Sequence, residues 1–326
     1  MSSKSGLIQI SGGAGFVGSN LVKRLIRNET TLVIVVDNFS SGSIENLRPV
    51  LHAKNLRILR NDVRSAPFAA CHEIYHLSSY AAPDLYMKKP IETIDTNFNG
   101  AKRLLDLAYH YKAKILFSSS SEVYGSPVEN PQNETFWGYV NPIGSRSSYD
   151  EAKRATEALF VAYQVERNVS IRIVRIFNTF GPGMLEKDGR LISSAITRAI
   201  RNEPIKIYGN GTQTRSNMYI DDLIDGMILT MQSDYEKPIN LGNPEELSVN
   251  EVVRMILEYT NSSSQVIHGH KRPDDPWIRR PDIRLAKRIL GWEPKYTFIK
   301  GLLKTIKYFM ALRENRNSTT ERMIIF

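Results

Sequence analysis

A tyrosine and a lysine stand four residues apart in the segment Tyr149-Asp150-Glu151-Ala152-Lys153. At this spacing both side chains lie on one face of a helix. An ammonium group beside a phenol can lower the pKa of the phenol, so that the tyrosine becomes a usable base near neutral pH. A hydroxyl from the serine run 118–121 could hold a substrate oxygen beside the pair. Because many helices carry the same spacing on an exposed surface, the elements that position the pair decide what it means.

The N-terminal part of the sequence predicts a strand, a glycine-rich turn, a helix and a second strand. The apolar run 7–11 leads into Gly12-Gly13-Ala14-Gly15-Phe16-Val17-Gly18, and after a helical pattern the apolar run 32–36 ends at Asp37. The glycines permit a tight turn that brings backbone N–H groups to a pyrophosphate at the helix N-terminus. A carboxylate at the end of the second strand can accept hydrogen bonds from the adenosine ribose, and it repels a 2′-phosphate. We therefore predict an NAD site.

Composition indicates a globular protein of a reducing compartment. The 326 residues are 41% hydrophobic and 24% charged, which is ordinary for globular chains. The net charge of +9 comes from dispersed residues, 43 basic and 34 acidic, with no Lys/Arg run, so we expect no nucleic-acid partner. Cys71 is the only cysteine, which excludes an internal disulfide. Without a leader or an apolar run near about 18 residues, we expect a cytoplasmic protein with no membrane segment. We also expect no metal site.

Strands and helices alternate through the first half of the chain. The pattern predicts strands at 56–59, 73–77, 114–117 and 171–175, and helices at 93–111 and about 149–166. Such alternation implies a parallel sheet with helices on both faces, in which ligands gather at the carboxyl ends of the strands. The glycine loop, the serine run and the tyrosine–lysine pair all lie at such ends.

Beyond Phe177 the alternation loosens, and Gly- and Pro-containing turns separate shorter elements. We therefore predict an α/β fold, a Rossmann-type doubly wound parallel sheet with a smaller C-terminal substrate-binding lobe. Residues 1–176 are expected to form the NAD-binding domain with the catalytic pair. Residues 177–312 are expected to form most of the second lobe, partly interleaved with the first. Residues 313–326 are a polar tail, expected to be frayed because it lacks apolar residues at helical spacing.

These motifs resemble a known family. The glycine loop, SSSEVYG (118–124) and YDEAK (149–153) are similar to extended short-chain dehydrogenase/reductases that act on nucleotide sugars. The likeness continues through NPIGSR (141–146), RIFNTFGP (175–182), YGNGTQTR (208–215), NLGNPEE (240–246), DDPWIRRPDI (274–283) and LGWEP (290–294). As a set they resemble the UDP-glucuronate decarboxylases, also called UDP-xylose synthases. The resemblance covers residues 6–310, nearly the whole chain.

The resemblance implies three steps on one sugar. Tyr149 would remove the C4 hydroxyl proton while tightly bound NAD⁺ takes the C4 hydride, with Lys153 supporting the phenolate and Ser120 holding the C4 oxygen. The new ketone makes the C5 carboxylate a β-keto acid, which loses CO₂ because the ketone stabilises the resulting enolate. NADH then returns the hydride to C4, giving UDP-xylose. Glu122 would handle the sugar ring or the C5 proton, and Arg279 would meet the glucuronate carboxylate as a bidentate fork.

The resemblance also implies binding residues and an assembly. The implied NAD contacts are Gly12, Gly15, Phe16, Val17, Gly18, Asp37, Asn38, Ser40, Gly42, Asp62, Val63, Leu77, Ser79, Thr96, Ser118, Tyr149, Lys153 and Thr179. The implied contacts to the UDP-sugar are Tyr86, Asn178, Arg190, Arg215, Arg272 and Arg279. Members of this family usually pair as homodimers through two helices per subunit, here about 95–111 and 149–166.

Other functions stay open at this point. Asp95 departs from the pattern, because the decarboxylases carry a lysine there, and an acid near an anionic sugar needs a cation partner or must point away. A 4,6-dehydratase would need an acid pair at 121–122, and Ser121 removes half of it. A C4 epimerase needs the tyrosine and lysine but no arginine for a carboxylate, and an apiose-forming relative would contract the ring after decarboxylation. A catalytically silent NAD-sensing protein would be free to lose the serine, tyrosine and lysine, all of which are present.

Overall fold

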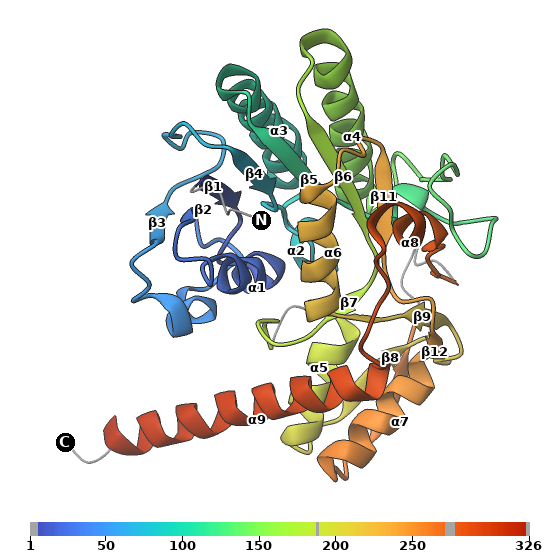
Figure 1. Ribbon diagram of the computed structural model, residues 1–326. Coiled ribbons are helices and arrows are strands. Elements are labelled where there is room, and N and C mark those ends of the chain that lie inside the picture. The colour runs from blue at the N-terminus through green and yellow to red at the C-terminus, as the bar shows by residue number, and fades with distance from the viewer. Residues whose placement is uncertain (1–5, 187–188, 271–277, 324–326) are drawn as a thin grey trace.

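The computed structural model describes residues 6–186, 189–270 and 278–323. These residues form a central parallel sheet of seven strands in the order β11-β6-β5-β4-β1-β2-β3 (Figure 1). The strands are β1 (Leu7–Ser11), β2 (Leu32–Asp37), β3 (Leu56–Arg60), β4 (Glu73–His76), β5 (Lys114–Ser120), β6 (Ile171–Ile176) and β11 (Pro238–Leu241). The first strand lies inside the sheet and the order runs outward from it in both directions, as in a Rossmann fold. The predicted fold class is confirmed.

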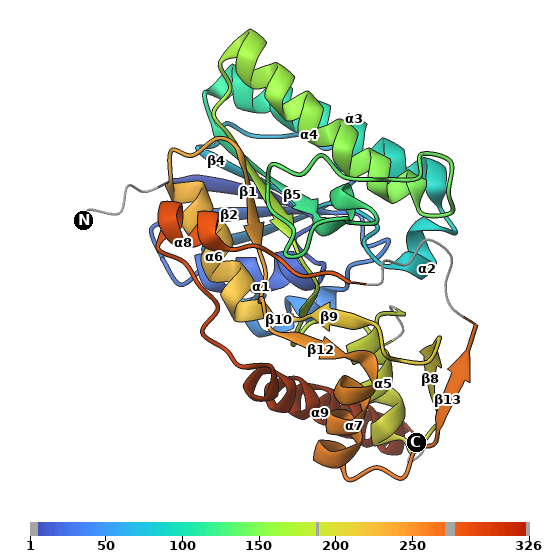
Figure 2. The same ribbon diagram turned by 90° about the vertical axis from the view of Figure 1, so that its right-hand side faces the viewer.

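Helices cover both faces of this sheet (Figures 1 and 2). On one face, α3 (Pro90–Tyr111) and α4 (Ser147–Arg167) pack against each other and against β4, β5 and β6. On the other face lie α1 (Phe16–Leu25) and α6 (Ile220–Gln232), which pack against each other and against strands of the sheet. The sheet is therefore covered on both sides, and its ligands can reach it only at the strand ends.

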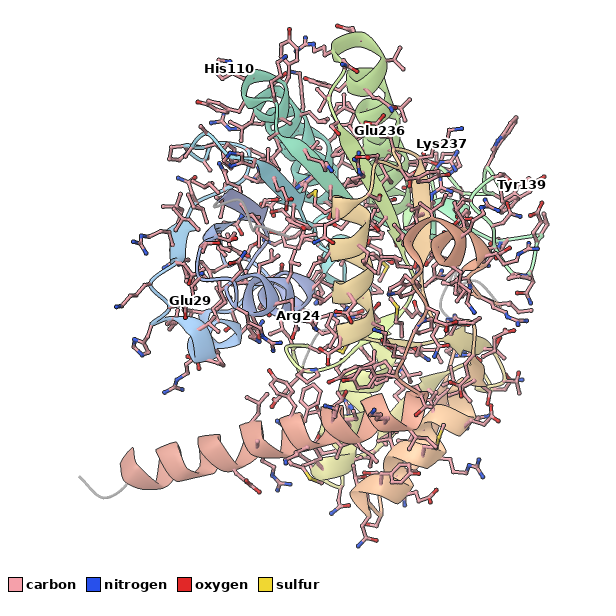
Figure 3. The ribbon with its side chains drawn as sticks, in the orientation of Figure 1. Arg24, Glu29, His110, Tyr139, Glu236 and Lys237 are labelled. Carbon is pink, nitrogen blue, oxygen red and sulfur yellow. The ribbon has the colours of Figure 1, made fainter. Side chains whose placement is uncertain are left out.

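Burial on both faces explains the apolar strand sequences. Ile10 of β1, Val33 and Val35 of β2 and Ile115 of β5 have no exposed surface. Strands covered on both faces read as continuous apolar runs instead of alternating ones. The helices that cover them are also tied to each other, for example by the ion pair between Arg24 of α1 and Asp225 of α6 (Arg24 is labelled in Figure 3).

A second group of elements lies beyond the carboxyl ends of the strands, at the bottom of Figures 1 and 2. Its elements include the helices α5 (Leu191–Ile200), α7 (Val249–Thr260) and α9 (Phe298–Met323), and the strand pairs β8 (Ile205–Tyr208) with β13 (Val266–Gly269) and β9 (Thr214–Ser216) with β12 (Glu246–Ser248). Between these elements the chain returns to the sheet as α6, β11 and α8 (Arg284–Leu290). Both groups therefore contribute residues to any site between them.

The C-terminal tail differs from the sequence-based prediction. Residues 313–323 were expected to be frayed, but they continue helix α9. The first turns of this helix are anchored in the second group, where the ring of Phe298 lies 5.2 Å from that of Phe180. Extending an existing helix costs much less than starting one, and the segment contains no glycine or proline to end it. None of the helices in the described residues is long and apolar enough to cross a membrane.

Candidate active site

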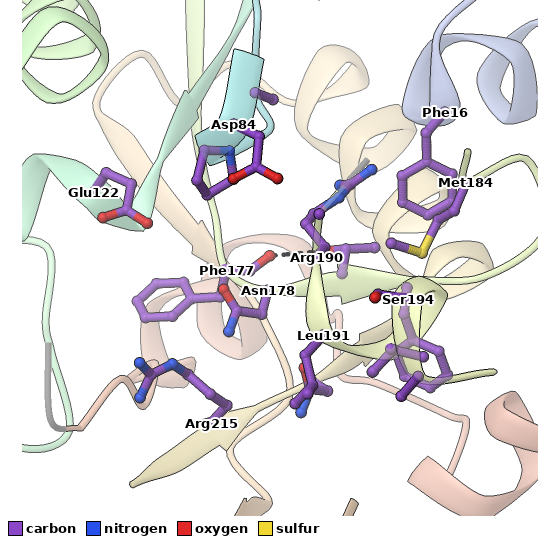
Figure 4. Close-up of a pocket in the computed structure, with 18 of the residues that line it drawn as sticks. Phe16, Asp84, Glu122, Phe177, Asn178, Met184, Arg190, Leu191, Ser194 and Arg215 are labelled. Atoms are coloured by element: carbon purple, nitrogen blue, oxygen red, sulfur yellow. Dashed lines mark hydrogen bonds between the residues drawn. The ribbon is translucent and has the colours of Figure 1, made fainter. Parts of the chain in front are cut away.

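Most of the predicted catalytic and substrate-binding residues surround one cavity of about 610 Å³. It lies between the carboxyl ends of β4, β5 and β6 and the elements α5, β8 and β9. Figure 4 shows Glu122 and Arg215 on one side of it and Phe16 and Met184 on the other. The predicted residues that line it are Phe16, Val17, Leu77, Ser79, Tyr86, Ser118, Ser120, Glu122, Tyr149, Lys153, Asn178, Thr179, Arg190, Arg215 and Arg279. Arg272 lies outside the described residues.

A smaller hollow lies beside the glycine loop. Its lining includes most of the other predicted NAD contacts, namely Gly12, Gly15, Asp37, Asn38, Ser40, Gly42, Val63 and Thr96. Leu77 and Ser79, which follow β4, line both the hollow and the main cavity. The two hollows therefore adjoin at the end of β4, between the residues predicted for the adenosine and the nicotinamide ends of one dinucleotide.

The glycine loop leaves room for a pyrophosphate. Gly12 has φ +76°, and a Cβ there would lie within 2.9 Å of the backbone that follows β4. Helix α1 begins at Phe16 with Gly15 as its N-cap, and no side chain of the described residues caps this end. The N–H groups of the first turn can therefore bind an anion. Gly18 meets a packing need, because a Cβ there would lie 2.1 Å from the carbonyl oxygen of Gly12.

Asp37 ends β2 at the smaller hollow. Its Oδ2 accepts a hydrogen bond from the N–H of Ala14 at 2.9 Å, and its Oδ1 accepts one from the N–H of Phe39 at 2.8 Å. Burial raises the pKa of Asp37, and these two backbone hydrogen bonds oppose the rise. A carboxylate oxygen has more than one lone pair, so the fixed carboxylate can still accept ribose hydroxyls. This geometry fits the adenosine end of NAD.

Asp37→Ala is expected to weaken NAD binding by about 10- to 100-fold, because a hydrogen bond to a charged group contributes about 1.5–3 kcal/mol. Titration calorimetry with NAD measures the effect. Asp37→Asn is the control, since its amide oxygen still accepts one backbone hydrogen bond and keeps the loop in place. Unchanged NAD affinity in Asp37→Ala would contradict the assignment.

Arg64 is the cation partner of two neighbouring acids, Asp62 and Asp95. Its guanidinium donates to Asp62 at 2.8 Å and also pairs with Asp95. The hydrogen bonds from Arg64 lower the pKa of Asp62 to about 2. Hydrogen bonds from Asn99 and Arg64 lower the pKa of Asp95. The unusual acid at position 95 therefore has its own cation, while Val63 and not Asp62 lines the hollow.

The tyrosine–lysine pair lies on the buried face of α4. Tyr149 and Lys153 are one turn apart, and the Nζ of Lys153 donates to the carbonyl oxygen of Ser118 at 2.8 Å. Ser120 ends β5 and makes a hydrogen bond with the Tyr149 side chain. Helix α4 and strand β5 thus bring the tyrosine, the lysine and the serine to one wall of the cavity. The ring of Tyr86, from α2 (Pro83–Tyr86), stacks on Tyr149 with centroids 5.0 Å apart and an interplanar angle of 13°.

Burial shifts the pKa values of both Tyr149 and Lys153. Burial raises the pKa of Tyr149 to about 12, although the hydrogen bond with Ser120 opposes the rise. Burial lowers the pKa of Lys153 to about 7, although the charge of Glu157 opposes this. The Nζ of Lys153 lies 5.6 Å from the centre of the Tyr149 ring. The expected lowering of the Tyr149 pKa is therefore outweighed by burial, which raises it.

Glu122 and Arg279 are direct partners although they are 157 positions apart in the sequence. The guanidinium of Arg279 donates two hydrogen bonds to the carboxylate of Glu122, with an Nη1–Oε1 distance of 2.6 Å and an Nη2–Oε2 distance of 2.8 Å. The Nη2 of Arg146 lies 2.7 Å from Oε2 of the same carboxylate. Burial acts to raise the pKa of Glu122, but the two guanidinium charges outweigh burial and hold this pKa well below its ordinary value. Glu122 is therefore ionised near neutral pH and cannot donate a proton in this state.

Arg146 is the residue of this site that the sequence-based prediction missed. It precedes the first turn of α4, three residues before Tyr149, and its side chain lines the cavity. The signal was present, since Arg146 is the last residue of the NPIGSR motif. The structure also separates Arg279 from its neighbour, because Arg280 is turned toward Glu246, with a guanidinium–carboxylate distance of 3.6 Å.

The chain is similar to a known family and to individual relatives over most of its length. Residues 9–305 match the family described as GDP-mannose 4,6 dehydratase. UDP-glucuronic acid decarboxylase 1 of Xenopus tropicalis is 44% identical over 309 residues, 95% of this chain and 73% of the relative. UDP-glucuronic acid decarboxylase 5 of Arabidopsis thaliana is 45% identical over 295 residues, 90% of this chain and 86% of the relative.

Solved structures share the whole fold. A UDP-glucose 4-epimerase of Thermotoga maritima with UDP-glucose has a TM-score of 0.86 at 28% identity, and the match covers 94% of this chain and 99% of that one. A dTDP-glucose 4,6-dehydratase of Streptomyces venezuelae, solved with NAD bound, has a TM-score of 0.87 at 25% identity, covering 95% and 98%. The similarity thus extends over both groups of elements that surround the cavity.

Proposed function

The chain belongs to the GDP-mannose 4,6-dehydratase family, and we propose that within this family it is an NAD-dependent UDP-glucuronate decarboxylase. One observation carries the choice of reaction. The guanidinium of Arg279 reaches the same cavity as Tyr149 and Ser120. One sugar can therefore meet a base at its C4 hydroxyl and a cation at its C5 carboxylate.

The residues around the cavity divide the chemistry among them. NAD⁺, when bound, supplies the hydride acceptor at C4 and a positive charge that favours the ionised form of a nearby phenol. Tyr149 accepts the C4 hydroxyl proton, Ser120 orients that oxygen, and Lys153 holds the cofactor's ribose. Arg279 keeps the substrate carboxylate ionised and in place. Once C4 is a ketone, the bond from C5 to the carboxylate breaks and CO₂ leaves, because the ketone stabilises the electron pair that remains.

Product analysis tests this function. The purified protein is incubated with UDP-glucuronate and NAD⁺, and the nucleotide sugars and CO₂ are identified by mass spectrometry. We expect UDP-xylose and one CO₂ for each sugar consumed. A product consisting only of UDP-galacturonate would show a C4 epimerase, and absence of CO₂ would refute decarboxylation. UDP-apiose as the product would show the ring-contracting reaction instead.

We also propose a homodimer formed by α3 and α4. Both helices carry exposed apolar side chains, among them Ile94 and Tyr109 of α3 and Val161 and Val165 of α4, with Val165 81% exposed. Exposed apolar residues that cluster on paired helices are suited to packing against the same helices of a second copy.

The double substitution Val161→Glu, Val165→Glu is expected to convert a dimer into a monomer, since it places four buried carboxylates in a symmetric interface. Sedimentation velocity measures the mass of both proteins. Val128→Glu is the control, because Val128 is also exposed but lies in a loop outside these helices. A wild-type protein that sediments as a monomer would contradict the proposed dimer.

The proposed location is the cytoplasm. Cys71 is the only cysteine, so the fold contains no internal disulfide that would require an oxidising compartment. Fluorescence localisation of the tagged protein tests this assignment.

A further inference from the structure

Two arginines hold Glu122, and they do so independently. Arg279 grips both carboxylate oxygens, whereas Arg146 contacts Oε2 alone at 2.7 Å. All three side chains are nearly buried, with exposed fractions of 12% for Glu122, 7% for Arg279 and 8% for Arg146. A carboxylate at this depth needs at least one cation to stay ionised.

A substrate carboxylate that binds Arg279 must compete with Glu122 for the same guanidinium nitrogens. Its two terminal nitrogens already bind Glu122, and a second carboxylate that binds the same fork in bidentate fashion has to displace the first. Arg146 enters from another element, the start of α4, so its contact with Glu122 does not depend on Arg279. Glu122 therefore keeps one cation when Arg279 turns to another carboxylate.

Arg146 is fixed by the same structure that positions the base. Its carbonyl oxygen accepts the N–H of Tyr149 at 3.0 Å, at the first turn of α4. Its guanidinium lies over the ring of Tyr86, 5.8 Å from the centroid, and Tyr86 in turn stacks on Tyr149. The position of Glu122 is thus tied to the position of Tyr149 through Arg146.

The charges of this cluster leave an excess of positive charge for a ligand. Asp150 is the other acid nearby, with its Oδ2 3.9 Å from Nε of Arg146. Burial and the charge of Glu122 raise the pKa of Asp150, so it neutralises the arginines only in part. The two guanidinium groups therefore face one firmly ionised carboxylate, Glu122, and a substrate carboxylate completes the balance.

We propose that Arg146 is a positioning residue for the decarboxylation: it retains Glu122 as an ionised carboxylate at the cavity wall while Arg279 exchanges Glu122 for the carboxylate of the sugar. This inference rests on the proposed function and deepens it. Glu122 binds the guanidinium of Arg279, and Arg146 makes the exchange possible because it is a second cation that can hold Glu122 when Arg279 binds the substrate.

Arg146→Gln tests this role through the pH profile. Without Arg146, Glu122 competes harder for Arg279, so the KM for UDP-glucuronate is expected to rise by about 10-fold or more while inhibition by UDP stays unchanged. When the substrate draws Arg279 away, Glu122 has no cation, and its pKa rises. The acid limb of kcat is therefore expected to move to higher pH by more than about one unit. The other groups that face Glu122 are Tyr86, Tyr149 and Asp150; the substitution keeps these three side chains but also removes the Arg146 charge that acts to lower the pKa of Tyr86 and of Asp150.

Two further variants separate positioning from folding. Arg146→Lys keeps a cation and should return the acid limb close to that of the wild type. Arg154→Gln is the matched control, because Arg154 lies two turns further along α4 and donates to the carbonyl oxygen of Val123, beside Glu122, through a neutral contact. It should leave the pH profile unchanged.

An unshifted acid limb in Arg146→Gln, or an equal shift in Arg154→Gln, would overturn the positioning role. Bound NAD and thermal unfolding, measured on each variant, show whether it is folded. Wild-type protein that releases no CO₂ would overturn the proposed function and this inference with it, whereas wild-type turnover with an unshifted Arg146→Gln would overturn the inference alone.

Discussion

Tyr149→Phe is expected to lower the turnover of UDP-glucuronate by about 10²- to 10⁴-fold while the protein keeps its bound NAD. The substitution removes the hydroxyl that we propose takes the C4 proton, and it leaves the ring, which can still stack on Tyr86 at 5.0 Å. The cavity keeps its shape, so the loss falls on the chemical step. Turnover is measured as CO₂ release, and NAD content is measured by chromatography after acid denaturation.

The control for this variant is Tyr163→Phe. Tyr163 lies on the same helix, and its hydroxyl donates to Asp106, away from the cavity. The same loss of one hydroxyl from α4 should therefore leave turnover within about threefold of the wild type. Substantial activity in Tyr149→Phe would refute the assigned base, and a loss of NAD from that variant would indicate that the phenol serves binding instead.

Arg279→Ala is expected to reduce kcat/KM for UDP-glucuronate by about 30-fold or more, because losing one partner of a buried charged pair costs about 2–5 kcal/mol. The binding of UDP-glucose, which has no carboxylate, should change by less than about threefold. NAD content should also stay near that of the wild type, because Arg279 pairs with Glu122 and lies apart from the glycine loop. Kinetics with UDP-glucuronate and titration with UDP-glucose measure the two effects.

Arg280→Ala is the matched control for this second variant. It removes the same side chain one position further on, where Arg280 pairs with Glu246. We expect its kcat/KM to remain within about threefold of the wild type. If Arg279→Ala weakened the binding of UDP-glucuronate, UDP-glucose and NAD to the same extent, the arginine would have a general structural role and not a carboxylate-specific one.

The sheet and the glycine loop could be predicted because their determinants are local. A strand buried on both faces must be apolar, as Val33 and Val35 are, and the carboxylate of Asp37 follows directly from the strand end. The alternation of strands and helices then places every strand end on one edge. The one prediction of this kind that was wrong is the frayed tail, because helix extension beyond residue 312 depends on an anchored start and not on an apolar pattern.

The interior of the site could be predicted only as a set of residues. Glu122 and Arg279 were each predicted to contact the substrate. The long-range ion pair between them depends on how the end of β5 and the segment after residue 277 meet in space. The same holds for Arg64, which neutralises Asp95 from a different element. Arg146 was missed because it ends a loop, and only its contacts identify its role. Burial also raises the pKa of Tyr149, an effect that no spacing reveals.

The most direct measurement uses UDP-glucuronate that carries deuterium at C4 of the sugar. If one enzyme-bound cofactor removes the hydride, and returns it after CO₂ has left, the product is UDP-xylose that still carries deuterium at C4, with one hydrogen from solvent at C5. Nuclear magnetic resonance of the product reads both positions. UDP-xylose formed with full retention at C4 and one equivalent of CO₂ is the predicted result, and deuterated UDP-galacturonate without CO₂ would contradict it.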